Sequence, residues 1–310
     1  MQVHRGYDDI AGCRNGFVSI GNFDGVHRGH QGMIATLLRN AAEEAAPAVI
    51  FTFDPHPITL LRPERSPPPL TTTDRKLELL AQSGVEHVVV YPTDQALLNL
   101  SPREFFDQIV LDRLDVRGLV EGPNFFFGRD RAGSIRTLHE FCSAAGRLLE
   151  VVPPVLVGEQ LVSSTEIRRL IGAGQMRAAG ELLGTSYRIT GTVVRGAERG
   201  RQIGFPTANL EEIGTVVPGD GVYAGRARVG SNWFAAGINV GPNPTFADRQ
   251  RKVEVHLIDF SEDLYGSHLT VELIERLRDT QRFDGITALQ AQLADDVSRA
   301  RALAKGNVSR

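Results

Sequence analysis

The hydrophobic pattern of this 310-residue chain changes near residue 185. Before that point, short apolar runs alternate with segments in which apolar residues recur at helical spacing; after it, apolar and polar residues alternate between glycine turns. The first pattern is typical of a parallel, doubly wound sheet, and the second of a small antiparallel β-barrel. We therefore predict an α/β protein with two domains, residues 1–185 and 186–310, in keeping with a length above that of most single cores.

In the first half we expect five buried strands with helices between them, a helix-starting capping box at 101–104, and two short helices near the end. The proline-rich segment between Pro55 and Pro69 should be a surface loop without regular structure. The expected strands are 17–20, 48–53, 85–91, 119–120 and 148–152, and the helices include one ending before Pro47, then 74–83, 134–145, one opening at 163–166, and 176–183.

The second half should begin its barrel at Tyr187 and end with a C-terminal helix over Ile286 to Ala300, followed by a disordered tail from Lys305 to Arg310. The further strands that we expect lie within 222–229, 233–240, 253–259 and 269–273.

Composition limits the classes of partner. The net charge of -3 gives no basic footprint for nucleic acid. The N-terminus lacks the apolar stretch of a signal peptide, and no apolar run is long enough to span a membrane. Cys13 and Cys142, the two cysteines, are far apart, which suits a reducing compartment. We expect a cytoplasmic protein that acts on small molecules; a homo-oligomer stays open.

The stretch Gly21-Asn22-Phe23-Asp24-Gly25-Val26-His27-Arg28-Gly29-His30 joins the first expected strand to a helix. Glycines allow a close backbone approach to a ligand, and the first N–H groups of a helix favour anions. His27 and His30 can stabilise charge on phosphate oxygens, which predicts an adenylyl-transfer site with ATP contacts at Gly21, Phe23, Asp24 and Gly25. The alternative is that the histidines only cap or pack.

The segment Ser163-Ser164-Thr165-Glu166-Ile167-Arg168 opens a later helix. Arg168 offers a guanidinium fork to the β and γ phosphates of ATP, and we predict further ATP contacts from Ser163, Ser164 and Thr165. A capped surface helix with a solvated arginine is the alternative.

In the second half, a glycine- and arginine-rich loop can wrap phosphates, and we predict nucleotide contacts from Arg195, Gly196, Arg201 and Gly204. Thr207 and Asn209 lie two apart on an extended segment, so their oxygens can share a hard cation, for which Mg²⁺ bridging nucleotide phosphates is the natural candidate. An ordinary basic turn is the alternative.

Taken together, these motifs resemble the bacterial bifunctional riboflavin kinase/FAD synthetases. The adenylyltransferase half is matched by 21–30, 52–57, 122–128 and 163–168, and the riboflavin kinase domain by 204–209, 221–224, 239–246, 253–256, 263–266 and 277–278. The resemblance implies that ATP phosphorylates riboflavin to FMN, and that AMP is then transferred from ATP to FMN to give FAD and pyrophosphate.

The resemblance also implies residue roles. In the first half, His27 and His30 contact phosphates, and the flavin lies near Asn124 and the neighbouring aromatics Phe125 and Phe127, with Phe53, Pro55 and Pro57 also assigned to it. An apolar slot suits a planar tricyclic ligand, although at least one ring of the run 125–127 should belong to the core.

In the second half, Thr207 and Asn209 hold Mg²⁺, and Glu254 takes the proton of the riboflavin 5′-hydroxyl, with Phe205, Arg278 and Phe283 on the flavin side. Glu254 alternates with Val253 and Val255, so it points away from the face that they fill. A surface glutamate is the alternative. His256 should be structural rather than a second base.

Several positions depart from the family pattern. Asn124 stands where many members have aspartate, Phe126 and Glu166 replace residues that are often basic, and Thr280 replaces an acidic residue. We expect the changes at Phe126 and Glu166 to retune substrate affinity without removing the reaction, and the change at Thr280 to alter how the flavin-side loop closes while activity persists. Two other readings remain: a riboflavin kinase whose first domain is degenerate or acts on another substrate, and a flavin-binding regulator without turnover.

Overall fold

The computed structural model describes residues 1–7, 9–196, 199–243 and 248–306. The chain forms two compact units: the first contains 1–67 and 72–162, and the second contains 68–71 and 163–310. The division therefore falls earlier in the chain than the predicted boundary near residue 185. Within the described residues, no helix has the length and apolar character that crossing a membrane requires.

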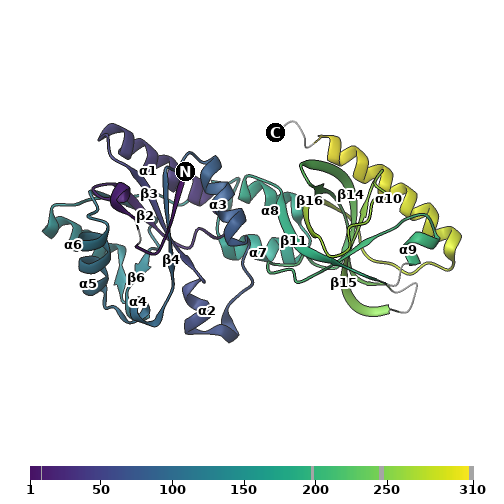
Figure 1. Cartoon of the computed structure of the whole chain (residues 1–310), viewed down its shortest axis with the longest axis horizontal. Helices are drawn as coiled ribbons and strands as arrows, with labels where there is room; N and C mark the ends of the chain where they lie inside the picture. Colours follow the sequence, from purple (N-terminus) through teal and green to yellow (C-terminus); the bar gives the residue numbers. More distant parts are fainter. Residues whose placement is uncertain (8, 197–198, 244–247, 307–310) are drawn as a thin grey trace. The chain divides into compact units, whose positions relative to one another are not determined.

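The first unit is built on a six-stranded parallel sheet (Figure 1). The prediction of a parallel sheet is confirmed, but the expected number of strands was too low, because the first four-residue strand adds to one edge. The opposite edge strand is partly exposed rather than buried. In spatial order the strands are β1 (Gln2–Arg5), β4 (His87–Pro92), β3 (Ala48–Asp54), β2 (Phe17–Ile20), β5 (Gly118–Glu121) and β8 (Leu148–Val151).

Alternate residues of the central strands enter two separate cores, as expected for a doubly wound sheet. Ile50 and Val88 pack with α1 and α3, whereas Phe51 and Val89 pack with α5 and α6. The helices of this unit are α1 (Arg28–Glu43), α2 (Pro57–Leu61), α3 (Thr73–Gln82), α4 (Gln95–Asn99), α5 (Pro102–Phe105), continued by π-helical turns over Phe106–Arg113, and α6 (Ile135–Ala145). The short hairpins β6 (Phe126–Phe127) with β7 (Gly133–Ser134) and β9 (Leu156–Val157) with β10 (Gln160–Leu161) complete it.

The proline-rich segment after β3 is more regular than predicted. Pro57 occupies the first turn of α2, where a missing N–H does no harm, and the His56 side chain caps that helix by accepting the Ile58 N–H at 3.1 Å. A 3₁₀ turn, Pro63–Arg65, follows. The prediction of a loop without regular structure is therefore wrong for 57–61 and 63–65.

The strand order reverses between β2 and β5, which are neighbours in the sheet. Ligands of doubly wound sheets bind beyond the carboxyl ends of the strands at this point. The two ends are joined there, because the Ile20 N–H donates to Glu121 Oε1 at 2.7 Å. Burial raises the pKa of the Glu121 carboxyl well above its usual value. The segment 21–30 leaves β2 at this place.

In the second unit, two helices, α7 (Ser164–Gly172) and α8 (Met176–Leu183), precede a closed six-stranded barrel (Figure 1). The predicted antiparallel barrel is confirmed, with β11 pairing with β16 to close it. Its strands are β11 (Tyr187–Val194), β12 (Ala208–Glu211), β13 (Gly221–Val229), β14 (Asn232–Asn243), β15 (Asp248–Leu257) and β16 (His268–Arg278), with α9 (Arg199–Gln202) between β11 and β12.

The C-terminal helix α10 (Ile286–Gly306) packs on the barrel through Ala300 and neighbouring apolar residues. Lys305 and Gly306 belong to this helix, so the expected disorder from Lys305 is wrong for these two, and 307–310 lie outside the described residues. The family motif at 239–246 likewise runs beyond them, at 244–246.

A short segment from the first half of the sequence, Pro68–Thr71, belongs to the second unit. Leu70 is fully buried, the Pro69 carbonyl accepts the Val216 N–H at 3.0 Å, and the Pro68 carbonyl accepts Arg168 Nε at 2.9 Å. The second unit is thus completed by a piece of chain that precedes α3 in sequence.

Candidate active sites

The turn after β2 is held in an unusual backbone conformation. Phe23, Gly25 and Val26 have φ values of 48°, 82° and 39°, in the left-handed region where only glycine is unstrained. The Phe23 ring is only 1% exposed and lies 5.1 Å from the His30 ring, so it offers little surface to a ligand. Asp24 and Gly25 are buried beside it. The turn therefore packs the buried Phe23 ring against the His30 ring.

His27 and His30 are brought together, as predicted. Their rings stack with centroids 3.7 Å apart, and His27 caps α1 by accepting the His30 backbone N–H at Nδ1 over 3.4 Å. A neutral His27 must then carry its proton on Nε2. Both the capping alternative and the phosphate-binding prediction fit this arrangement, because capping uses only one ring nitrogen.

His30 Nδ1 is buried and has no hydrogen-bond partner in the described part of the chain. Burial, the neighbouring His27 and then Lys76 lower the pKa of His30 well below its usual value. The ring is therefore neutral at pH 7, and its orphaned nitrogen requires a partner that the protein itself does not supply.

Lys76 is a charged residue of this site that the sequence analysis missed. The side chain, 7% exposed, extends from α3, and Nζ lies 3.2 Å from the Asn22 carbonyl, 3.3 Å from Thr52 Oγ1 and 3.4 Å from the Phe53 carbonyl. Burial lowers its pKa, and Asp24 and Asp54 oppose that shift. A lysine in an amphipathic helix carries no local signal of this role.

The predicted flavin residues of the first unit differ in accessibility. Asn124 is exposed after β5, and Phe125 is partly buried, with its ring 5.6 Å from that of Phe127. Phe127 is 5% exposed and packs on Phe105, so it is mainly a core residue. Phe126 is exposed, and the Arg131 guanidinium lies 4.8 Å from its ring, which keeps a basic group at this departure from the family pattern.

At the end of β3, Phe53 is partly buried and packs with Phe51, and Pro55 is exposed after a cis Asp54–Pro55 bond. Pro57 starts α2. All three follow the carboxyl end of one strand, the edge at which the sheet topology predicts ligands.

The helix start at 163–168 belongs to the second unit. Ser163 caps α7 by accepting the Glu166 N–H at 3.2 Å, Ser164 begins the helix, and Thr165 is exposed. Arg168 donates from Nε to the Pro68 carbonyl. Glu166 receives two hydrogen bonds from Arg169, at 2.8 and 2.6 Å, so a basic side chain accompanies this departure too.

In the barrel, three polar residues form a row across neighbouring strands. Asn209 of β12 is directly opposite Glu254 of β15, which is directly opposite Asn239 of β14. Asn239 Nδ2 donates to Glu254 Oε2 at 3.3 Å. Val253 and Val255 are buried on the other face, which confirms the predicted orientation of Glu254.

Gly196 lies against this row. A Cβ atom at that position would be 2.2 Å from Asn209 Nδ2, so only glycine allows the loop to approach the amide this closely. The neighbouring Arg195 is exposed, with its guanidinium 5.3 Å from the Tyr265 ring.

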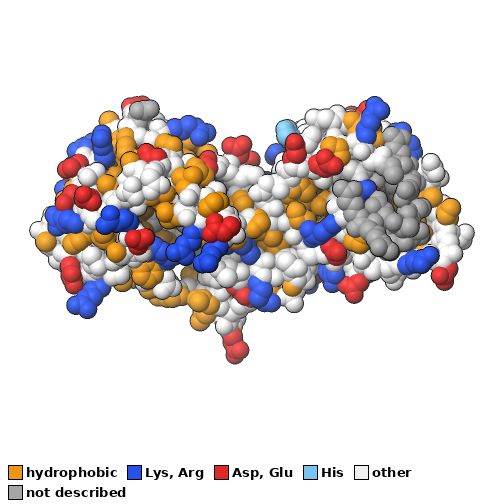
Figure 2. All heavy atoms as spheres, turned by 90° about the horizontal axis from the view of Figure 1, so that it is seen from below, with side chains coloured by type: hydrophobic (Ala, Val, Ile, Leu, Met, Phe, Trp, Pro, Cys, Tyr) orange, Lys and Arg blue, Asp and Glu red, His pale blue; other side chains and the backbone are white. Residues whose placement is uncertain are grey.

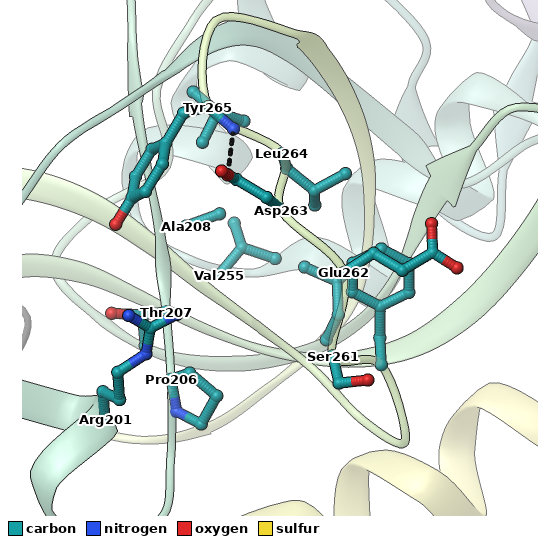
Figure 3. Close-up of a pocket in the computed structure, with 13 residues that line it drawn as sticks. Arg201, Pro206, Thr207, Ala208, Val255, Ser261, Glu262, Asp263, Leu264 and Tyr265 are labelled. Atoms are coloured by element: carbon teal, nitrogen blue, oxygen red, sulfur yellow. Dashed lines mark hydrogen bonds between the residues drawn. The ribbon is translucent and has the colours of Figure 1, made fainter.

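A cavity of about 260 Å³ opens between α9, β12, β15 and the segment 260–265 (Figure 3). Arg201 and Thr207 line it, together with Tyr265 and the backbone-bonded Asp263, whose Oδ1 accepts the Tyr265 N–H at 2.9 Å. Asn209 is not among the lining residues. The structure thus places Thr207 in the cavity and Asn209 in the polar row.

The loop between α9 and β12 is fixed by His256. Its Nδ1 lies 2.8 Å from the Pro206 carbonyl, and since a carbonyl only accepts, this nitrogen carries the proton. The ring also meets that of Phe205 edge-on at 5.6 Å, and Gly204 takes a φ of 89°. These contacts agree with the structural role predicted for His256.

Arg278 makes a buried ion pair that the sequence did not suggest. Its Nε and Nη2 lie 3.0 and 2.8 Å from Asp296 Oδ2, and Asp296 is 3% exposed on α10. The guanidinium is also 5.6 Å from the Phe283 ring. Arg278 therefore ties β16 to α10, and Thr280 lies two residues beyond the end of that strand.

Charges of both signs are interspersed over the face drawn in Figure 2, without one continuous basic patch.

Comparison with known proteins identifies both halves. The family model for FAD synthetase matches residues 11–166, and that for riboflavin kinase matches 183–304. The curated bifunctional riboflavin kinase/FMN adenylyltransferase of Pseudomonas fluorescens is 38% identical, with full coverage of both chains. The protein of the same name from Escherichia coli K12 is 34% identical, and the match covers 97% of each chain. The one from Bacillus subtilis 168 is also 34% identical, and the match covers 91% of this chain and 90% of the relative.

A solved structure titled as a macrolide-efflux protein from Streptococcus pneumoniae has a TM-score of 0.85 and 30% identity, covering 97% of this chain and 99% of its own. It shares the fold over both units. On the two family matches and the whole-length similarity to its relatives, the chain belongs to the bifunctional riboflavin kinase/FMN adenylyltransferase family.

Proposed function

We propose that the barrel unit transfers the γ-phosphate of ATP to the 5′-hydroxyl of riboflavin, giving FMN and ADP. The observation that carries this assignment is the row Asn209–Glu254–Asn239 on one face of three adjacent strands. Glu254 takes the hydroxyl proton as the oxygen attacks the γ-phosphorus, and Asn239 holds one carboxylate oxygen through its amide.

We assign the nucleotide of this reaction to the cavity beside Thr207. Arg201 and the neighbouring Arg195 bring positive charge, and the backbone of the loop around Gly196 and Gly204 suits close approach of phosphates. Hydroxyl and amide oxygens of Thr207 and Asn209 are hard donors that fit Mg²⁺, which when bound offsets charge on the ATP phosphates. Phe205, Arg278 and Phe283 remain our candidates for the flavin side.

We further propose that the site at the turn after β2 transfers AMP from ATP to FMN. An FMN phosphate oxygen attacks the α-phosphorus, the bond to the β-phosphate breaks, and pyrophosphate leaves, so no covalent enzyme intermediate is needed. His27 and His30 donate to phosphate oxygens as charge develops, which gives the orphaned His30 nitrogen a partner. Lys76 adds positive charge next to the turn, where its Nζ contacts the Asn22 carbonyl.

The remaining predicted contacts belong to this second reaction. Gly21, Asp24 and Gly25 supply backbone at the turn. Ser163, Ser164, Thr165 and Arg168, at the start of α7 in the second unit, remain our candidates from the sequence for ATP contacts. The flavin lies against the exposed surfaces of Asn124, Phe125, Pro55 and Pro57. Phe53 and Phe127 support those surfaces from the core.

Two incubations test the two activities separately. Purified protein is given riboflavin and MgATP, or FMN and MgATP, and products are separated by chromatography with pyrophosphate measured in parallel. We expect FMN and then FAD in the first, and FAD with equimolar pyrophosphate in the second. Phosphorylation of riboflavin without adenylylation of FMN would contradict the second activity and favour a monofunctional kinase. Binding of flavin without formation of either product would contradict both activities and favour a flavin-binding regulator.

We also propose that the protein works in the cytoplasm and that its partners are these small molecules rather than nucleic acid. The net charge of -3 and the mixture of charges on the face drawn in Figure 2 support this. Retention on duplex DNA at low salt, or recovery from a membrane fraction of lysed cells, would contradict it.

A further inference from the structure

We infer that His4, Cys13 and His87 form a binding site for a single thiophilic divalent cation, with zinc as the best match. The three residues come from β1, from the 3₁₀ turn Ala11–Cys13 and from β4, in the first unit. Their donor atoms all lie within 4.8 Å of one another. No motif used for either proposed reaction includes them.

The two imidazoles are already spaced as ligands of one ion. His4 Nε2 lies 3.1 Å from His87 Nδ1. Tetrahedral coordination with zinc–nitrogen bonds of about 2.05 Å places two ligating nitrogens about 3.3 Å apart, and a nitrogen and a sulfur about 3.5 Å apart. Binding would thus move the two nitrogens slightly apart and draw the sulfur toward them by about 1.3 Å at most.

Burial makes the cluster more selective than a surface group of histidines. Cys13 is fully buried and His4 is 8% exposed, whereas His87 is partly exposed and gives the ion access to water for its fourth position. Gly12 leaves room for the His87 ring, since a Cβ there would lie 3.2 Å from His87 Cε1. Two nitrogens and a thiolate favour zinc over magnesium or calcium.

In the metal-free protein the same imidazoles share a hydrogen bond, with one nitrogen donating and the other accepting. This bond leaves the thiol unused. On binding, the proton between the two imidazoles would move to the other nitrogen of the donating ring, so that both rings stay neutral, and the thiol proton would be released to water. One cation would then crosslink three segments and stabilise the edge of the sheet to which β1 adds.

Cobalt(II) provides a test whose readout is independent of catalysis, because thiolate coordination produces a ligand-to-metal charge-transfer band. Tag-free, metal-stripped, reduced protein is titrated with Co²⁺, and zinc is then added in competition. We expect one equivalent of Co²⁺ to give the thiolate band and zinc to abolish it. Wild-type protein that binds no Co²⁺, or binds it without the thiolate band, overturns the inference.

The chain offers a matched control in its second cysteine. Cys142 is also fully buried, in the same apolar core as Cys13. Cys13→Ser should lose the band, and Cys142→Ser should keep it; a band that survives Cys13→Ser overturns the assignment.

The histidines provide an independent set of variants if Cys13→Ser fails to fold, as judged by circular dichroism. We expect His4→Gln and His87→Gln to weaken Co²⁺ binding by at least about 100-fold, the upper range for loss of a supporting partner of a metal ligand. His139→Gln, an exposed histidine on α6, serves as the control. Unchanged affinity in both His4→Gln and His87→Gln contradicts the proposal.

Discussion

The two candidate active sites are built in different ways. At the turn after β2, one short stretch of chain supplies both histidines, and their three-residue spacing at the start of α1 brings the rings together. In the barrel, Asn209, Glu254 and Asn239 come from three strands, and only strand register aligns them. A site of the first kind depends on local backbone conformation, whereas a site of the second kind depends on the whole sheet.

The comparison predicts that riboflavin phosphorylation and FMN adenylylation can each be removed without the other. The largest effect should come from Glu254→Gln. The amide keeps the size of the side chain but cannot take a proton, so riboflavin phosphorylation should fall by roughly 100- to 10,000-fold. Formation of FAD from supplied FMN should not change. Initial rates of both reactions under saturating MgATP measure this.

The control for that variant is Glu211→Gln, because Glu211 is an exposed residue of β12 on the same face as Asn209. We expect both reactions to be normal in it. Loss of FAD formation in a folded Glu254→Gln protein would show that the two sites are not separable.

His30→Ala should do the reverse. Loss of one preorganised donor to the developing phosphate charge lowers the rate by roughly 100- to 1,000-fold, so FAD formation from FMN should fall by that factor, with riboflavin phosphorylation unaltered. His139→Ala is the control. A His30→Ala enzyme that still makes FAD at the wild-type rate would leave the stacked histidines with only a capping and packing role.

Gly25→Ala tests the dependence of the first site on backbone conformation. Placing an L-residue at a φ of 82° costs about 1–2 kcal/mol, so the turn should be destabilised by that amount and FAD formation should drop. Hydrogen exchange of the α1 amides reports on this unit. Trp233, the one tryptophan in the sequence, lies in β14, so its fluorescence reports on unfolding of the barrel unit. We expect the denaturation curve measured by that fluorescence to be the same in the variant and the wild type.

Gly172→Ala is a suitable control, since a Cβ there meets nothing within 4 Å and its backbone is helical. Equal destabilisation by the two substitutions would mean that backbone strain at the turn is not what Gly25 relieves.

The smallest expected effect is on the pH dependence of stability. The pKa of His30 is lowered in the folded protein, so below the usual value of 6.5 the unfolded chain binds a proton that the folded site refuses. Stability of the first unit should therefore fall as the pH decreases through 6.5. His30→Gln should reduce the loss between pH 7.5 and 5.5 by about 1.4 kcal/mol.

Hydrogen exchange of the α1 amides at the two pH values measures this difference. The raised pKa of Glu121 acts in the opposite direction and is common to both proteins, so it cancels in the comparison. An identical pH dependence in wild-type and His30→Gln protein would contradict the lowered pKa.

The sequence was sufficient for the architecture where periodicity was strong. It predicted the parallel sheet, the barrel and the C-terminal helix, but it missed β1, because four residues with one buried side chain carry no usable period. It also missed α2, where several prolines suggested irregular chain although one proline at a helix start is favourable.

For the sites, local motifs were predictable and long-range neighbours were not. The stacked histidines follow from three-residue spacing at a helix start, whereas Lys76 reaches the same turn from a helix about 50 residues later in the chain. The Arg278–Asp296 pair and the cluster of His4, Cys13 and His87 likewise join residues whose proximity depends on the tertiary fold. Single-sequence patterns contain no information about such pairs.

The placement of Pro68–Thr71 affects how this enzyme can be dissected genetically. A gene fragment starting at Ser163, or at residue 186, encodes the whole barrel but omits the buried Leu70 and the Pro69 carbonyl that accepts the Val216 N–H. Such a truncated kinase would expose the apolar surface that Leu70 covers and would leave the Val216 N–H without its carbonyl partner. Exposed apolar surface promotes aggregation during expression. Point substitutions in the intact polypeptide are therefore the cleaner route to enzymes with one activity each.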